Sequence, residues 1–420
     1  MQKTLFSSWP LFFGLAMIMI GNGLQGTLLG VRANIEGFPT LTIGLIMSLY
    51  YAGFLAGSVY VPRLIQGVGH IRVFAALASL ASATVLLHGI FTDPVSWSVV
   101  RAVTGFSYAG LYIVIESWLN QAATNENRGK VMALYLIILY AGMAAGQFLM
   151  NIADPAQIEL FVLTSILVTL AVVPISLSSR PAPTFVRPER VAIKELFRTS
   201  PLGIAGVGFS GLASSALFAI GPVYAAASGM SVAQIASFMA VFMIGGVMGQ
   251  APIGWLSDKI DRRKVLIGVA GIAGLCCILT GVVSAFSPNL VIVMMFFIGF
   301  FSLSIYGQSL SHTNDHLQAA QIVAVSATLI LLNGGISVIG PFLVTGMMSS
   351  FGDIAFFPYV GVIYLALCLF GLYRARISPP VPMSEQGDFV VMQESSTPVI
   401  MQLAEDAPPD EESGKAAAQG

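Results

Sequence analysis

One apolar stretch of this chain carries an arginine, two tyrosines and a glutamate on a single helical face. At 3.6 residues per turn, the residues that share this narrow stripe are Arg101, Gly105, Tyr108, Tyr112 and Glu116. Exposing an ionisable side chain to hydrocarbon costs roughly 2.5–3.5 kcal/mol, so such a group normally faces a cavity or a charged partner. The stripe therefore predicts a polar path for a solute or a proton.

The two charged residues of the stripe are too far apart to pair with each other, since their separation is roughly 22 Å at 1.5 Å per residue. Arg101 is predicted to bind a substrate or to take part in coupling, with a structural hydrogen bond to the first helix as the alternative. Glu116 falls near the other end of the helix, where two roles stay open. It carries a proton, or it closes a gate with Arg128 or another base of the following loop.

Amide and phenol side chains in other apolar stretches extend this predicted path. They are Asn22, Gln25, Tyr50, Tyr51, Tyr140, Gln147, Tyr224, Gln250, Gln308 and Asn333. Each of them can instead form an interhelical hydrogen bond. We assign six of them to the substrate or proton pathway together with the stripe: Asn22, Gln25, Tyr51, Gln147, Gln308 and Asn333.

A dense charge cluster occupies residues 258–264, which read DKIDRRK. Asp258 falls at the end of an apolar stretch and Arg262 follows four residues later, so the carboxylate can accept hydrogen bonds from the guanidinium group. Such a pair can latch the ends of neighbouring helices, and Arg72 and Arg128 are predicted to belong to the same cytoplasmic gate. The alternative is a basic loop that only fixes the orientation of the chain.

The composition requires a membrane as the solvent for these stretches. Hydrophobic residues make up 56% and charged residues 9% of the 420 residues, which is incompatible with the charged surface of a water-soluble globule. A spanning helix needs about 20 mainly apolar residues. The stretches of that kind are 9–31, 40–61, 71–92, 95–118, 130–152, 157–178, 201–227, 232–256, 264–286, 288–310, 320–347 and 353–375. They do not alternate as barrel strands do, so we predict an all-α membrane protein with twelve transmembrane helices.

Lysine and arginine are concentrated in every second loop. The loops of one side hold Arg63, Arg72, Arg128, Lys130, Arg180, Arg187, Arg190, Lys194, Arg198, Lys259, Arg262, Arg263 and Lys264, and Arg374 and Arg376 follow the last helix. The other side holds Arg32 and the acidic residues Glu36, Asp93, Asp154, Glu159 and Asp353. Because cytoplasmic loops are enriched in lysine and arginine, both termini are predicted to be cytoplasmic.

The two halves of the chain repeat each other. At one constant offset, Gly53, Gly57, Gly69, Arg72 and Val73 match Gly245, Gly249, Asp261, Lys264 and Val265. At a slightly longer offset, Gly105, Tyr112, Ser117 and Asn120 match Gly299, Tyr306, Ser311 and Asn314. Duplicated halves are common in secondary transporters, whose substrate site lies at their interface. We therefore predict two six-helix halves.

With these features the chain resembles the major facilitator superfamily. Residues 254–264, which read GWLSDKIDRRK, are similar to the loop 8–9 signature of that superfamily, with Asp261 where a second glycine is usual. Residues 66–72, QGVGHIR, are similar to a degraded copy in loop 2–3, with Gln66 in the acidic position. The resemblance covers residues 5–376 and implies the major facilitator fold.

Shorter motifs point to one branch of these transporters. Residues 101–105, RAVTG, resemble the helix 4 motif, whereas 142–147, GMAAGQ, lack the Gly-Pro pair of the drug/proton antiporters. The segments that resemble the YcaD-like branch are IES at 115–117, NRG at 127–129, GQ at 146–147, HTND at 312–315 and GP at 340–341. The resemblance implies a transporter of the bacterial inner membrane.

Four regions of different composition follow from this reading. They are an N-terminal half at 1–179, a basic cytoplasmic linker at 180–200, a C-terminal half at 201–376 and an acidic cytoplasmic tail at 377–420. The tail is predicted to be disordered, because it is too polar to bury a core. Its two apolar patches, 389–392 and 399–401, are either docking segments or spare hydrophobic residues of a linker.

The function predicted from the sequence is secondary active transport of a small polar or anionic solute by alternating access, with protons as the coupling ion and a monomer as the working unit. The alternative is a non-transporting membrane receptor or scaffold that signals through its acidic tail. We expect no enzyme activity, no catalytic residue, no cofactor and no nucleic-acid partner, because no phosphate-binding glycine loop or nucleophile and base pair is present. His312, Asp315 and His316 are interpreted as a solvated loop rather than a metal site.

Overall fold

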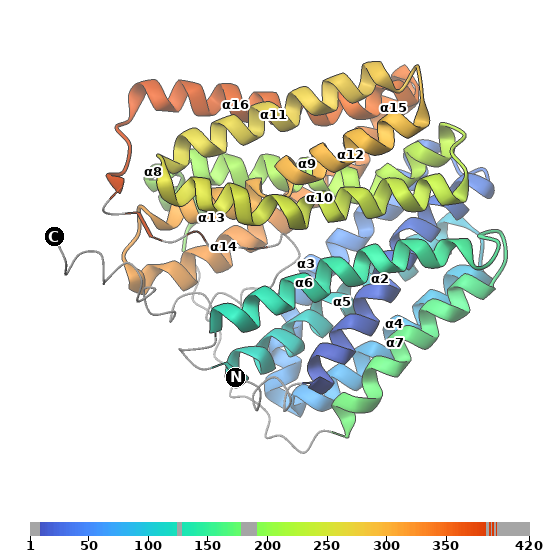
Figure 1. The fold of residues 1–420 in the computed structure, drawn as a ribbon. Coiled ribbons are helices and arrows are strands. Elements are labelled where there is room, and N and C mark those ends of the chain that lie inside the picture. The colour runs from blue at the N-terminus through green and yellow to red at the C-terminus, as the bar shows by residue number, and fades with distance from the viewer. Residues whose placement is uncertain are drawn as a thin grey trace.

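The structure, a computed structural model, describes residues 9–123, 128–177, 191–383, 386–387, 389 and 392. Within these residues twelve helical spans are long and apolar enough to cross a membrane, as the hydropathy predicts. The helices of the first half are α2 (Trp9–Ile35), α3 (Thr40–Val68), α4 (His70–Ile90), α5 (Pro94–Ala122), α6 (Arg128–Phe148) and α7 (Glu159–Ser176), with a short η1 (Leu149–Asn151) after α6. Figure 1 shows this half as one bundle, in blue to green, beside the second half.

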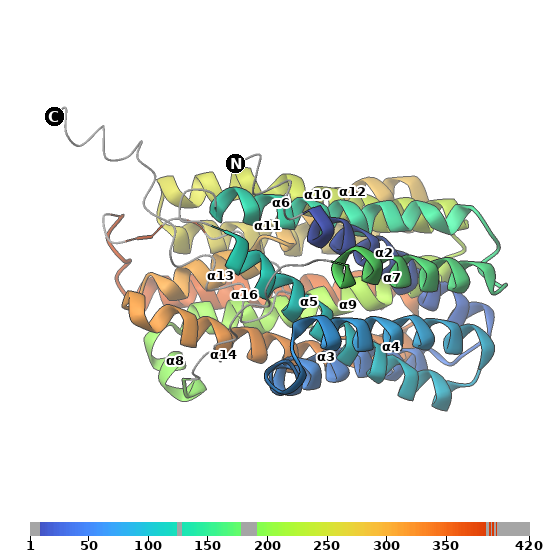
Figure 2. The same cartoon turned by 90° about the horizontal axis from the view of Figure 1, so that it is seen from below.

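The second half contains α9 (Pro201–Ala227), α10 (Val232–Lys259), α11 (Arg262–Val283), α12 (Pro288–Ser302), α13 (Ile305–Asn314), α14 (Ala319–Ser337), α15 (Gly340–Phe351), η2 (Asp353–Ala355) and α16 (Phe356–Ile377). A further short helix, α8 (Ile193–Thr199), lies inside the segment predicted as a linker. Seen from below, the long helices of both halves run along a common direction (Figure 2). The sequence analysis did not predict α8.

Local sequence signals begin several of these helices. Pro94, Pro201 and Pro288 lie in the first turn of α5, α9 and α12, where the missing proline N–H is not needed for a helical hydrogen bond. Asp261 caps α11, because its carboxylate accepts a hydrogen bond from the Arg263 N–H at 3.0 Å. The aspartate that replaces the usual glycine of the signature therefore starts a helix.

Two spans are broken, which the sequence analysis did not predict. The tenth span is divided into α12 and α13, and the eleventh into α14 and α15. Pro341 in the first turn of α15 explains the second break, since proline cannot continue the preceding hydrogen-bond ladder. At the first break the Ser304 hydroxyl donates to the Phe301 carbonyl at 2.8 Å, a side-chain bond that competes with regular helix.

The predicted internal repeat appears in the structure as two equivalent helix contacts. Gly53 and Gly57 of α3 face the backbone carbonyls of Ala102 and Phe106 in α5. At the repeat positions, Gly245 and Gly249 of α10 face the carbonyls of Phe296 and Phe300 in α12. These small residues let both helix pairs approach closely, so the repeat is one of packing as well as of sequence.

A methyl group at one of these contacts should destabilise the protein. A Cβ atom at Gly53 would touch the Ala102 backbone, whereas one at Gly268 of α11 would meet nothing within 4 Å. We expect Gly53→Ala to lower the free energy of unfolding by about 1–3 kcal/mol through overpacking. Gly268→Ala, the matched control, should be neutral or stabilising because alanine favours helix. Thermal unfolding in detergent checks both, and equal melting temperatures would contradict the close packing.

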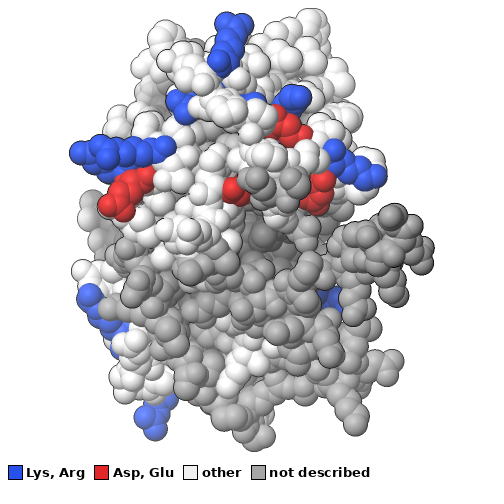
Figure 3. Space-filling model, turned by 90° about the vertical axis from the view of Figure 1, so that its left-hand side faces the viewer, with Lys and Arg blue, Asp and Glu red and all other residues white. Residues whose placement is uncertain are grey.

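The bundle has two unlike ends. We call the end that carries residues 68–70, 259–262 and 374–378 the basic end, and the end that carries 36–39, 91–93 and 228–231 the opposite end. Figure 3 looks onto the basic end, where lysine and arginine side chains are spread over the surface with a few acidic ones. The basic residues that the sequence places in the loops of this side therefore lie on its folded surface (Figure 3).

The two halves touch each other at the opposite end. A methyl group at Gly30 of α2 would lie 3.0 Å from the Cβ atom of Pro222 in α9, and Gly44 of α3 faces Thr345 of α15. Toward the basic end the ribbons of the two halves diverge (Figure 1). The structure thus shows the conformation in which the opposite end is closed.

Candidate functional site

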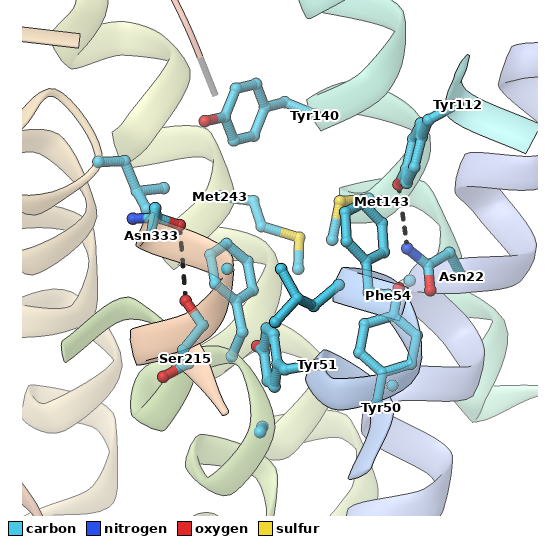
Figure 4. A pocket seen from close by; sticks show the side chains of 18 of the residues that line it. Asn22, Tyr50, Tyr51, Phe54, Tyr112, Tyr140, Met143, Ser215, Met243 and Asn333 are labelled. Atoms are coloured by element: carbon cyan, nitrogen blue, oxygen red, sulfur yellow. Dashed lines mark hydrogen bonds between the residues drawn. The ribbon is translucent and has the colours of Figure 1, made fainter. Parts of the chain in front are cut away.

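A cavity lies between the two halves and contains about 1210 Å³ of space that no atom fills, its open part included. Side chains of α2, α3, α5 and α6 form one wall, and side chains of α9, α10 and α14 form the other. Figure 4 shows Tyr50 and Asn22 on the first wall, with Met243 and Asn333 across the cavity. Leu303, which lies in the first helix break, and Ser337, the last residue before the second break, also line it.

Arg101 is the charged residue of this lining. Its side chain is 6% exposed, and its guanidinium carbon lies 4.4 Å from the centre of the Tyr50 ring. The Nε and Nη1 atoms have no hydrogen-bond partner among the described residues. No aspartate or glutamate is among the described residues that line the cavity. A buried cation without a carboxylate partner is costly in a membrane protein and marks a functional site.

Three other polar side chains of the first wall, Asn22, Tyr112 and Gln147, are bonded to neighbouring groups. Asn22 donates to the Tyr112 hydroxyl at 3.3 Å (Figure 4). Gln147 accepts a bond from the Thr27 hydroxyl at 2.5 Å and donates to the Gly23 carbonyl at 2.9 Å. These bonds hold α2 against α5 and α6, so Asn22 and Gln147 orient the wall from which Arg101 projects.

The second wall is mainly apolar. Its side chains include Phe218, Met239, Met243, Ile330 and Leu331. Its polar residues bond to neighbouring backbone: Asn333 donates to the Val207 carbonyl at 3.1 Å, and Ser337 donates to the Gly211 carbonyl at 3.2 Å. The wall therefore offers a solute mostly carbon and sulfur atoms.

The structure brings some of the predicted pathway residues to the cavity and not others. Those that line it are Asn22, Tyr51, Arg101, Tyr112, Gln147 and Asn333. Those that are absent from its lining are Gln25, Tyr108, Glu116 and Gln308, all of them fully or almost fully buried. The sequence pattern identified these four as polar side chains of membrane helices. Polarity alone does not distinguish a side chain that lines a cavity from one that is buried between two helices.

The four residues outside the lining have other surroundings. Glu116 accepts a hydrogen bond from the Tyr135 hydroxyl at 2.7 Å inside the first half. Gln308 accepts one from the Ser257 hydroxyl at 2.8 Å near the basic end. The amide of Gln25 and the hydroxyl of Tyr108 have no hydrogen-bond partner among the described residues.

Apolar cavity residues were missed by the sequence analysis. They include Phe54, Leu55, Met143, Phe218, Met239, Met243 and Ile330. In a membrane helix an apolar side chain facing lipid and one facing a cavity have the same hydropathy, so no pattern of polarity could have selected them. The repeat and the polar stripe were the signals that located the cavity.

The charge cluster at the basic end is built around Arg262, whose side chain is 1% exposed. Its Nη1 atom lies 2.7 Å from the Asp315 carboxylate and its Nη2 atom 3.2 Å from the Asp258 carboxylate. Its Nε atom donates to the Ser257 hydroxyl at 3.0 Å. Burial raises the pKa of the Asp315 carboxyl group, and the Arg262 charge acts in the opposite direction. The cluster joins the ends of α10, α11 and α13.

The other predicted gate residues stand apart from this cluster. Arg72 is exposed near the start of α4, and no described carboxylate forms an ion pair with it. The side chain of Arg128 lies outside the described residues. Asp315, which the sequence analysis placed in a solvated loop, has a side chain that is only 2% exposed. No group of metal-ligating side chains is found among the residues that the structure describes.

The family model described as Major Facilitator Superfamily matches residues 11–341, with a further match over 204–402. The chain belongs to the Major Facilitator Superfamily. This chain is 25% identical to the MFS-type transporter YcaD of Escherichia fergusonii over 368 residues. The aligned residues are 87% of this chain and 95% of the relative. The Salmonella arizonae protein of the same name is 25% identical over 364 residues, 86% of this chain and 94% of the relative.

Solved structures share the superfamily fold with this chain. The nucleoside transporter NupG has a TM-score of 0.71 at 12% identity, covering 88% of this chain and 99% of NupG. A bacterial homolog of the human lysosomal transporter Spinster, in an inward-facing and occupied conformation, has a TM-score of 0.71 at 14% identity, covering 90% of this chain and 97% of the homolog. The predicted twelve-helix major facilitator fold is confirmed, and the protein is a membrane transporter of this superfamily.

Proposed function

We propose that this transporter is a secondary active transporter that moves a small polar or anionic solute by alternating access. The observation that carries the proposal is the cavity between the halves, which contains a buried Arg101 with unpartnered N–H groups. A site at the interface of two repeated halves can be exposed to either side by rocking of one half against the other. The contacts of Gly30 and Gly44 then form the gate that is closed in this conformation.

The basic end is proposed to be cytoplasmic, with both termini on that side of a bacterial inner membrane. The support is the charge asymmetry of the loops, which the positive-inside rule relates to orientation. In this orientation the structure is closed toward the outside. We take the single chain as the working unit, because each half already supplies one complete wall of the cavity.

Distances across the two ends test alternating access. We would label Asn34→Cys with Ser228→Cys at the opposite end and Gln66→Cys with His316→Cys at the basic end, all four positions being exposed. The background would replace Cys276, Cys277 and Cys368 by alanine. We expect two spin-label distance populations in lipid, with the opposite-end distance long when the basic-end distance is short. One fixed distance at both ends under every condition would favour a receptor or scaffold with this fold.

The same variants test the orientation. A membrane-impermeant maleimide applied to intact cells should label Asn34→Cys and spare Gln66→Cys. The reverse labelling would show that the chain is inserted with its basic end outside.

Proton coupling is proposed to use Glu116. Its carboxyl group is fully buried, hydrogen-bonded to the Tyr135 hydroxyl, and lies on the same helix as Arg101. A carboxyl group in such a place can carry a proton between the two conformations.

Glu116→Gln removes the titratable group and keeps the side-chain shape. We expect the variant to lose accumulation driven by a proton gradient and to retain exchange of solute across proteoliposome membranes. Tyr135→Phe is the matched control, since it removes the hydrogen bond but leaves the carboxyl group in place, and it should keep gradient-driven accumulation. Loss of both activities in Glu116→Gln would indicate a gate instead of a proton carrier.

A further inference from the structure

We propose that the solute is an amphipathic organic anion, with one acidic group bound at Arg101 and an apolar body held against the second wall. This inference rests on the proposed function, because it takes the cavity as the substrate site. It narrows the substrate class, since a solute that is polar along its whole length does not match the second wall.

The charge of the cavity selects an anion. Two nitrogen atoms of Arg101, Nε and Nη1, are buried without a hydrogen-bond partner among the described residues, and no described carboxylate lines the cavity. Its guanidinium group lies against the Tyr50 ring, which supports the cation from one side. A planar guanidinium can bind a carboxylate or phosphate oxygen pair in a bidentate manner. A bound acid would therefore supply the missing negative charge.

The second wall selects an apolar body. Met239 and Met243 are flexible and polarisable, so they can pack against aliphatic or aromatic groups of different shape. Phe218 of α9 adds an aromatic surface to the same wall. The polar groups of Asn333 and Ser337 already bond to helix backbone. A polyhydroxylated solute would thus leave hydroxyl groups unpaired on this side, which is unfavourable.

A set of four probes that differ in one feature each tests this assignment. They are 4-phenylbutyrate, 4-phenylbutylamine, 4-phenylbutanol and acetate. Binding to the purified full-length protein in detergent would be measured by thermal stabilisation, which detects any ligand of the folded state by mass action. We expect 4-phenylbutyrate to raise the melting temperature. The amine and the alcohol share its apolar body but lack the anion, and acetate lacks the body, so these three should give little change.

Two variants test which residues bind the acid group and the apolar body of 4-phenylbutyrate. Arg101→Gln should weaken 4-phenylbutyrate binding by at least about tenfold through loss of the charged bond. Met243→Gln should also weaken it, by several-fold, while the preference for the acid over the amine stays. Unaltered binding by Arg101→Gln, or equal stabilisation by the amine and the acid, would overturn the proposal.

Together with transport assays, these binding measurements test the anion site and the transport function separately. Binding of the acid by a protein that shows no exchange in proteoliposomes would reject the transporter function and keep the anion site. Exchange of a neutral sugar without any response to organic acids would keep the function and reject the anion site.

A different observation supports a second proposal, which concerns the tail. The Gly387 carbonyl accepts a hydrogen bond from Arg262 Nη2 at 2.6 Å, and its N–H donates to the Asp315 carboxylate at 3.1 Å. The Phe389 N–H donates to the Asp258 carboxylate at 2.9 Å, and its ring covers Gly254. Met392 is 1% exposed. We infer that the tail segment that carries Gln386, Gly387, Phe389 and Met392, the residues of it that the structure describes, is a strap that holds the basic end of the second half in the conformation seen here.

The strap fits the second half specifically. The repeat places Gln66 and His70 of the first half where the second half has Asp258 and Arg262, so the first half lacks two of the three charged groups that the strap binds. The strap contacts the end of α10, the start of α11 and the loop after α13. These parts of the second half must move relative to the first half when the basic end closes. Of the two apolar tail patches, the one that contains Phe389 and Met392 is therefore proposed to dock on the second half.

Residue 387 allows a matched test of the strap. Gly387→Pro removes the N–H that bonds to Asp315, whereas Gly387→Ala keeps it and meets no atom within 4 Å. We expect the proline variant, and a chain ending at Met383, to shift the spin-label population at Gln66 and His316 toward the short distance. The alanine variant should match the wild type.

A synthetic peptide of residues 384–395, added to the chain that ends at Met383, should restore the long distance, and a scrambled peptide should not. Unchanged distances in the truncated chain would overturn the strap, whatever the outcome for the anion site.

Discussion

Replacing Arg101 with methionine is expected to weaken binding of the organic anion strongly, to abolish its transport and, in the ligand-free protein, to raise thermal stability. The guanidinium group is buried and has no carboxylate partner among the described residues. Its burial therefore costs the empty protein free energy that an apolar side chain of similar length would not. A bound anion offsets that cost, and truncating one member of such a charge pair weakens binding by about 2 kcal/mol or more, roughly 30-fold.

A lysine at this position separates two kinds of binding. Arg101→Lys keeps the positive charge and loses the planar fork of N–H groups. If the acid is bound in a bidentate manner, transport should be lost in Arg101→Lys as in Arg101→Met, with both proteins folded. Rescue by lysine would show that the arginine acts by charge alone.

Arg63→Met is the matched control for this experiment. Arg63 is exposed, and its guanidinium carbon lies 5.4 Å from the centre of the Tyr60 ring, so it makes the same kind of contact outside the cavity. It should leave binding, transport and melting temperature near the wild-type values. Full transport by Arg101→Met at normal expression would show that the functional face of α5 lies elsewhere.

Arg262→Ala is expected to lower the free energy of unfolding by about 3 kcal/mol or more, because it leaves a buried carboxylate without its charge partner. The Asp315 side chain is 2% exposed and lies 2.7 Å from Arg262, whereas Asp258 is 41% exposed and can be solvated after the change. The loss should therefore come mainly from Asp315. Thermal and denaturant unfolding in detergent measure it.

A second substitution and the pH dependence test whether the unpaired Asp315 carboxylate causes the loss of stability in Arg262→Ala. The double variant Arg262→Ala with Asp315→Asn should recover part of the lost stability, since the amide carries no charge. In Arg262→Ala alone, burial raises the pKa of Asp315 without the opposing arginine. A carboxyl group whose folded pKa exceeds the unfolded value loses stability as the pH rises. The deficit relative to wild type should thus be smaller at about pH 4.5 than at about pH 7.5.

Arg263→Ala is the control for this cluster. Arg263 donates to the Ser378 carbonyl at 2.7 Å, and its partner Asp261 keeps its bond to the backbone of α11 after the change. We expect a small effect without the same pH dependence. A similar loss in both arginine variants would contradict the special role of the Asp315 pair.

The sequence by itself determined the spans, the repeat and the contacts that are local along the chain. Hydrocarbon accepts a backbone segment only as a helix with mostly apolar side chains, so hydropathy alone located the twelve spans. The Asp258 and Arg262 pair was predictable because four residues separate the two positions on the chain. The glycines at 53 and 245 signalled close packing because small residues repeated four positions apart let two membrane helices approach closely.

Only the tertiary structure decided which buried residues face the cavity. Glu116 lies on the predicted stripe with Arg101 but is covered by Tyr135 of α6, a contact made by another part of the chain. Gln308 was assigned to the pathway from its polarity, yet its partner is Ser257 beside Arg262. Met239 and Met243 gave no signal, because lipid and cavity wall are equally apolar surroundings for a methionine.

The tail shows the same division between sequence and structure. Its acidic composition predicted a segment without a core of its own, and its short apolar patch left docking open. The site for Gly387 and Phe389 is formed by Asp258, Arg262 and Asp315, which belong to two loops more than fifty residues apart. Local propensity and hydropathy act along the chain, whereas a site of this kind exists only after folding has brought distant charges together.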